Sequence, residues 1–174
     1  MSVPELQVGA QVLIIAGSET TATLLSGATY LLLRNLTTLE RLASEVRASF
    51  AQESDITMRS VSGLSYLNAV LNESLRMYPP TPNTFPRITP TTGEVVCGQF
   101  VPARTSVGVH HWATFRSAQN FRDPDCFIPE RWLGGTDFEQ DQRDALQPFS
   151  FGPRNCLGKK SESPPSPIIP ICII

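Results

Sequence analysis

The stretch Phe149-Ser150-Phe151-Gly152-Pro153-Arg154-Asn155-Cys156-Leu157-Gly158 decides how the rest of this sequence is interpreted. It places one cysteine in a short loop with glycine on either side, at Gly152 and Gly158, where the backbone can bend or pack closely. Arg154 lies two residues before the cysteine and is suited to bidentate binding of a carboxylate. The pattern favours a thiolate that binds a ligand or metal; the alternative is a glycine turn around a buried structural cysteine.

A thiolate that binds haem iron needs a tight loop, hydrogen bonds from backbone amides to sulfur, and a cation for the haem propionates. The quoted loop offers all three, and Phe149 would shield the sulfur from water. The loop resembles the cysteine signature of the cytochrome P450 family, F-x-x-G-x-R-x-C-x-G, and matches its five fixed positions. The resemblance implies haem b with Cys156 as the axial thiolate, and Phe149, Gly152, Arg154 and Gly158 as further cofactor-binding residues.

Two earlier motifs follow the order expected for that family. Glu73 and Arg76 are three residues apart on a predicted helix and can therefore pair, which for an isolated pair indicates an ordinary surface salt bridge. Pro129-Glu130-Arg131-Trp132 follows downstream. The resemblance implies that Glu73, Arg76 and Arg131 form a buried structural network, which would rigidify the segment leading into the cysteine loop.

The segment Ala16-Gly17-Ser18-Glu19-Thr20-Thr21 resembles the oxygen-activation motif on the long central helix of the family. Gly17 would leave room within the helix. Thr20 would offer a hydroxyl for proton delivery, and Glu19 would feed a proton relay toward solvent. The alternative is that hydroxyls in a buried helix bond back to their own carbonyls.

Arg87 falls where many family members place an arginine that binds a haem propionate; the alternative is an ordinary exposed arginine.

The adjacent His110 and His111 invite a metal interpretation. On a strand they would point to opposite faces, so we expect packing or contact with the haem edge instead.

The elements expected along the chain are mainly helical, with small β sheets on one side. An apolar helix spans about Leu6 to Leu36, and its polar centre favours burial in a globular protein over a membrane span. Amphipathic helices are expected at Leu39 to Gln52 and Leu64 to Met77, the latter stopped by Pro79-Pro80, with a loop at Glu53 to Ser62 between them. Short β segments are expected from Pro82 to Val109, and an irregular stretch from Trp112 to Gly152.

Composition excludes some classes of function. The 174 residues carry a formal net charge of −2, which argues against an electrostatic nucleic-acid binder. The four cysteines, at positions 97, 126, 156 and 172, include no C-x-x-C pair, and we expect free thiols rather than disulfides.

The resemblance covers about residues 3–159 and implies a monooxygenase that inserts one oxygen atom of O2 into a small apolar organic substrate. It also implies an NADPH-dependent flavoprotein reductase as partner. The motif style resembles microsomal members, and Pro-Glu-Arg-Trp-Leu resembles fungal ones. The full-length relative would then lie at the endoplasmic reticulum membrane, with no anchor in this chain.

The sequence departs from the family at both ends. We therefore interpret residues 1–159 as the C-terminal haem-binding portion of a truncated cytochrome P450 fold, without the family's N-terminal half. Residues 160–174 form a proline-rich tail that we expect to be disordered, because its prolines forbid the family's next helix. A read-through or frame error is our hypothesis for its origin. The alternative function is a catalytically inactive fragment.

Overall fold

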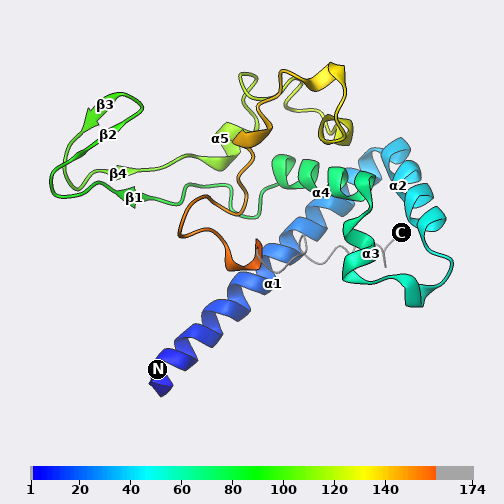
Figure 1. The fold of residues 1–174 in the computed structure, drawn as a ribbon, viewed down its shortest axis with the longest axis horizontal. Helices are drawn as coiled ribbons and strands as arrows, with labels where there is room; N and C mark the ends of the chain where they lie inside the picture. The colour runs from blue at the N-terminus through cyan, green and yellow to red at the C-terminus, as the bar shows by residue number, and fades with distance from the viewer. Residues whose placement is uncertain (1, 160–174) are drawn as a thin grey trace.

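The computed structural model describes residues 2–159 as a mainly helical chain with two small antiparallel sheets (Figure 1). The helices are α1 (Val3–Arg34), α2 (Leu36–Ser49), α3 (Met58–Ser62), α4 (Ser65–Met77) and α5 (His111–Phe115). Strand β1 (Arg87–Ile88) pairs with β4 (Ser106–Val107), and β2 (Glu94–Val96) pairs with β3 (Gln99–Val101). The predicted fold class is confirmed. The expected disorder of residues 160–174 lies outside the described residues.

The hydrophobic core lies where α2, α3 and α4 meet the C-terminal end of α1. Leu42 and Val46 form the apolar stripe of α2, and Leu67 and Val70 face them from α4. Glu45 of α2 also accepts hydrogen bonds from the backbone N–H groups of Tyr66 and Leu67, at 2.8 and 2.9 Å. Because these N–H groups belong to the first turn of α4, a side chain of one helix caps the other.

Helix α1 is buried only along its C-terminal half, which corrects the expectation of a helix enclosed by protein. Its buried residues are Leu24, Gly27, Ala28 and Leu32. Apolar side chains nearer its start are exposed, and the helix projects away from the other elements (Figure 1). The described residues place α4 and the core only against the C-terminal half. Within residues 2–159, α1 is the one helix long and apolar enough to cross a membrane.

The start of α1 shows why the helix begins there. Ser2 and Glu5 form a capping box, in which the backbone N–H of Ser2 donates to the Glu5 carboxylate at 2.6 Å. This hydrogen bond lowers the pKa of Glu5.

Two local expectations were wrong. The segment expected to be a loop from Glu53 to Ser62 contains a 3₁₀ turn and α3, because the side chain of Thr57 accepts a hydrogen bond from the backbone N–H of Ser60 and so caps a new helix. The two histidines expected on a strand lie at the start of α5, with His110 as its N-cap and His111 as its first residue.

The segment between α5 and the cysteine loop consists of turns joined by irregular backbone. Its 3₁₀ turns are Pro129–Trp132, Thr136–Phe138 and Arg143–Ala145. The backbone N–H of Gln142 donates to the carbonyl of Asn120 at 2.7 Å, which ties the later turns to the start of the segment. The chain then runs back to α1, where the cysteine loop, drawn in orange, lies beside the middle of the helix (Figure 1).

Candidate functional site

The cysteine loop is a tight turn closed by its own backbone. The N–H of Cys156 donates to the carbonyl of Phe149 at 2.9 Å, and the N–H of Asn155 donates to the carbonyl of Gly152 at 3.1 Å. Gly152 has φ of 83°, which favours glycine, and Ser150 also has a positive φ of 61°. Cys156 is exposed in this chain. A thiol presented in this way does not fit the alternative of a buried structural cysteine.

The loop, α1 and the segment from Leu75 to Arg87 line a partly open cavity of about 510 Å³, in the range of small-molecule and cofactor sites. Six of the residues singled out from the sequence line it: Glu19, Thr20, Arg87, Phe149, Arg154 and Cys156. Apolar side chains supply much of the remaining wall, among them Ile15, Leu24, Leu75 and Phe85. Segments far apart in the sequence therefore meet around one apolar space that contains a thiol.

The predicted glycines lie outside this lining. A Cβ built on Gly17 would meet no heavy atom within 4 Å, so in the described part of the chain its small size relieves no contact. A Cβ on Gly158 would lie 3.5 Å from the Cys156 sulfur, which is an ordinary contact. Of the three glycines singled out, Gly152 has the backbone conformation that favours this residue.

The charged groups of the cavity are unevenly partnered. Within residues 2–159, neither Arg87 nor Arg154 has a carboxylate within ion-pair distance; Arg87 donates to the carbonyl of Pro86 at 3.3 Å. Two guanidinium groups thus line an apolar space with no acidic partner among the described residues. The Thr20 hydroxyl donates to the carbonyl of Ala16 at 2.6 Å, the back-bonded geometry typical of hydroxyls in helices.

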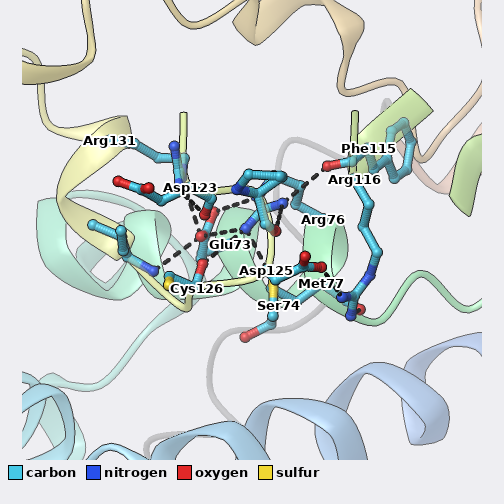
Figure 2. A network of polar contacts seen from close by, with 12 residues as sticks. Glu73, Ser74, Arg76, Met77, Phe115, Arg116, Asp123, Asp125, Cys126 and Arg131 are labelled. Carbon is cyan, nitrogen blue, oxygen red and sulfur yellow. Dashed lines mark hydrogen bonds and ion pairs between the residues drawn. The ribbon is translucent and has the colours of Figure 1, made fainter. Parts of the chain in front are cut away.

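A buried ionic network joins α4 to the turn Pro129–Trp132, which precedes the cysteine loop. Glu73, Arg76 and Arg131 have fully buried side chains. The Glu73 carboxylate accepts from the Arg76 guanidinium at 2.8 and 2.9 Å and from Arg131 Nε at 3.1 Å. Figure 2 shows the carboxylate between the two guanidinium groups. Two parts of the chain separated by more than fifty residues are therefore held together at one carboxylate.

Arg76 also binds backbone carbonyls at the end of α5 and in the segment that follows it. Its guanidinium donates to the carbonyls of Phe115, Pro124 and Cys126, at 2.9, 2.6 and 3.0 Å (Figure 2). The Phe115 carbonyl belongs to the last residue of α5, and the other two come from irregular backbone. One buried guanidinium thereby pairs with three backbone acceptors.

Sequence reasoning missed three members of this network. The backbone N–H of Ile128 and the indole N–H of Trp132 both donate to Glu73 at 2.9 Å. Asp141 pairs with the outer nitrogen of Arg131. Trp132 lies within the quoted Pro-Glu-Arg-Trp motif and could have been found there, whereas no local pattern marks Asp141.

The remaining candidates are structural among the described residues. His111 is buried, stacks on Phe115 with ring centroids 5.1 Å apart, and meets Phe85 edge-on at 5.4 Å. These ring contacts are the packing expected for His111. Residues 2–159 contain no group of three or more metal-binding side chains. Cys97, Cys126 and Cys156 are free thiols, as predicted, and Cys172 lies outside the described residues.

The chain as a whole is similar to known proteins. The sequence profile of the family described as Cytochrome P450 matches residues 1–160. Similar curated proteins include cytochrome P450 monooxygenase astA of Talaromyces wortmannii, 55% identical over 91% of this chain and 32% of that protein. Cytochrome P450 monooxygenase aclL of Aspergillus oryzae is 53% identical over the same shares. The chain thus spans about a third of the length of these relatives.

Solved structures give the same result. The crystal structure of the cytochrome P450DA heme domain aligns with a TM-score of 0.77 and 28% identity, covering 93% of this chain and 36% of that one. A mutant of that heme domain aligns with a TM-score of 0.81 and 26% identity, covering all of this chain and 37% of that one.

Proposed function

Because the chain belongs to the cytochrome P450 family, we propose that it supplies the haem site of a monooxygenase that inserts one oxygen atom of O2 into a small apolar organic substrate. Residues 1–159 are the haem-binding portion in this proposal. The observation that carries it is the cavity in which Cys156, Arg154 and Arg87 line one apolar space beside Glu19 and Thr20.

The residues around the cavity fit haem by their chemistry. A flat apolar macrocycle needs apolar walls, which Leu24 and Phe85 help to supply. Its two propionates need cations, and Arg87 and Arg154 have no acidic partner among the described residues that would compete. Its iron needs a ligand from the protein, and Cys156, an exposed thiol on a closed turn, would supply it.

When bound, haem supplies the redox chemistry at iron, and the protein supplies orientation, proton delivery and exclusion of water. Cys156 would hold the iron through its thiolate. Phe149 would limit the access of water to the sulfur. Glu19 and Thr20 would move protons from solvent toward the cavity. Thr20 must first release the carbonyl of Ala16, to which its hydroxyl is bonded.

The Glu73, Arg76 and Arg131 network has a structural role in this proposal. It holds the turns before the cysteine loop against α4 without touching the cavity, since none of the three residues lines it. Relatives of fungal origin support an NADPH-dependent flavoprotein reductase as electron donor and the endoplasmic reticulum membrane as the location of the full-length enzyme.

One observation favours a second candidate, a catalytically inactive fragment. Apolar side chains on the first half of α1, such as Leu13 and Ile14, are about two-thirds exposed. A chain that leaves this surface uncovered gives up hydrophobic stabilisation of roughly 25 cal/mol per Å². Such a chain could bind haem without holding a substrate against it.

The test is a reduced-plus-CO difference spectrum of the full 174-residue chain reconstituted with haem. A red-shifted thiolate-type Soret band that is lost in Cys156→Ser and kept in Cys126→Ser supports the proposal. Cys126 is the matched control because it is also an exposed free thiol and lies outside the cavity. A band that survives Cys156→Ser refutes the assignment of the ligand. A thiolate band, with no substrate oxidised when a reductase supplies electrons, supports the inactive fragment.

A further inference from the structure

Asp141 completes the buried ionic network from a part of the chain that no motif covers. Its residue is 8% exposed, and the side chains of Asp141 and Arg131 are almost fully buried where they pair. One carboxylate oxygen accepts from Arg131 Nη1, and the other accepts from the backbone N–H of Arg122 at 2.7 Å. The carboxylate therefore joins a buried cation to a backbone segment.

The charges of the network balance only when Asp141 is counted. Arg76 and Arg131 are cations, and within the described residues Glu73 touches both of them. With Glu73 alone, the buried cluster would carry one uncompensated positive charge, which is strongly destabilising in a low-dielectric interior. Asp141 supplies the second negative charge at the outer end of Arg131. The rings of Phe121 and Phe138 lie 5.9 and 5.0 Å from the Arg131 guanidinium and exclude water from it.

Asp141 lies where the chain turns toward the cysteine loop. The next residue, Gln142, donates its backbone N–H to the carbonyl of Asn120 at 2.7 Å. Together with the Asp141 bond to Arg122, this makes a double tether, because the adjacent residues Asp141 and Gln142 both bind the backbone of residues 120–122. Downstream of the tether, the chain forms the turn Arg143–Ala145 and then enters the loop that presents Cys156.

We propose that Asp141 is a positioning residue for the Cys156 loop. It neutralises the buried arginine pair together with Glu73, and it holds in place the start of the segment that leads to Cys156. The link to haem retention rests on the proposed function, whereas the effect of Asp141 on the loop itself does not.

The first experiment measures hydrogen exchange by mass spectrometry on the haem-free full-length chain. In Asp141→Asn, backbone amides of residues 147–156 should exchange about tenfold faster than in the wild type, which corresponds to about 1.4 kcal/mol of local opening free energy. The reference is Leu42→Ala, which lowers global stability by opening a cavity in the core where Leu42 of α2 is fully buried. Asp137→Asn, an exposed acid in the same segment, controls for the loss of charge.

Faster exchange confined to residues 147–156 in Asp141→Asn supports the proposal. Exchange equal to that of Leu42→Ala overturns it, since Asp141 would then contribute only to global stability. If Asp141→Asn does not fold, Asp141→Glu decides by the same comparison, because it keeps the charge beside Arg131 but displaces the acceptor of the Arg122 N–H.

The second experiment addresses the cofactor on haem-reconstituted protein. The thiolate-ligated fraction, read from the reduced-plus-CO spectrum, should fall in Asp141→Asn and remain in Leu42→Ala. An equal fall in both variants overturns the positioning role at the haem site. If the wild-type chain itself shows no thiolate band, the proposed function fails for this chain, and the exchange result still decides the role of Asp141.

Discussion

Replacing Glu73 with glutamine should be among the most damaging single changes in this chain. Glu73 is fully buried and accepts five hydrogen bonds, from the two arginines, the Trp132 indole and the Ile128 backbone. Glutamine has a similar shape but loses the charge and presents an NH2 group to neighbours that are all donors. Removing one partner of a buried ion pair costs about 3–5 kcal/mol, because the other charge stays uncompensated. A loss of that size is a large share of the about 5–15 kcal/mol that folds a domain.

The assay is urea unfolding followed by far-UV circular dichroism. With a slope of about 2 kcal/mol per molar urea, the midpoint should fall by about 1.5–2.5 M at an unchanged slope. The matched control is Asp125→Asn, which removes a carboxylate whose side chain is 81% exposed and paired with Arg116 at 3.0 Å. It should cost less than about 1 kcal/mol. A Glu73→Gln loss no larger than the control would refute the reasoning, because the buried cluster would then behave like a surface pair.

Three further predictions concern the helices, each measured by urea unfolding. Glu45→Ala should cost about 1–2 kcal/mol, because it removes the side-chain cap of α4; an unchanged midpoint would contradict the cap. Gly27→Ala should cost about 1–3 kcal/mol, because its Cβ would lie 2.5 Å from the Tyr78 ring; the added change Tyr78→Ser should recover part of this loss, and a purely additive double variant would count against the clash. Burial of the Tyr66 phenol raises its pKa, and the hydrogen bond that the phenol donates to Glu130 raises it further. The protonated phenol therefore stabilises the fold below pH about 10, and this stabilisation is lost as the pH rises through the raised pKa. Tyr66→Phe should cost about 0.5–1.5 kcal/mol at neutral pH and progressively less at strongly alkaline pH; a pH-independent difference would argue against this origin.

Local patterns in the sequence predicted the parts of the fold that local physics determines. The stop at Pro79-Pro80 and the apolar stripe ending at Met77 gave α4 nearly its observed bounds. The cysteine loop could be predicted because its glycines, arginine and cysteine lie within ten residues of one another. A short helix such as α3 escaped because its signal is a single capping threonine, Thr57, without an apolar stripe long enough to detect.

Long-range pairing could not be read from the sequence. Asp141 is one acid among several in a polar segment, and only the fold brings it to Arg131. The exposure of side chains could not be predicted from the sequence either. Leu13 and Leu24 look alike in the sequence of α1, yet Leu13 is 65% exposed and Leu24 is 2% exposed. The difference depends on which elements pack beside each turn of the helix, which is a property of the whole structure.

The position of the cavity along α1 bears on the choice between an active site and an inactive fragment. The buried anchor of the helix begins at Leu24, and Thr20 precedes it by about one turn, or roughly 6 Å of rise. The wall that carries Glu19 and Thr20 is therefore attached close to the core, whereas the most exposed apolar turns lie farther toward the N-terminus. Haem in this cavity would cover Ile15, which is 64% exposed, and would couple the helix to the cysteine loop. Since a ligand that binds only the folded state stabilises it, a haem-competent chain must gain resistance to urea on adding haem. If adding haem gives no resistance to urea, the chain does not hold haem between α1 and the cysteine loop. That result would favour the inactive fragment.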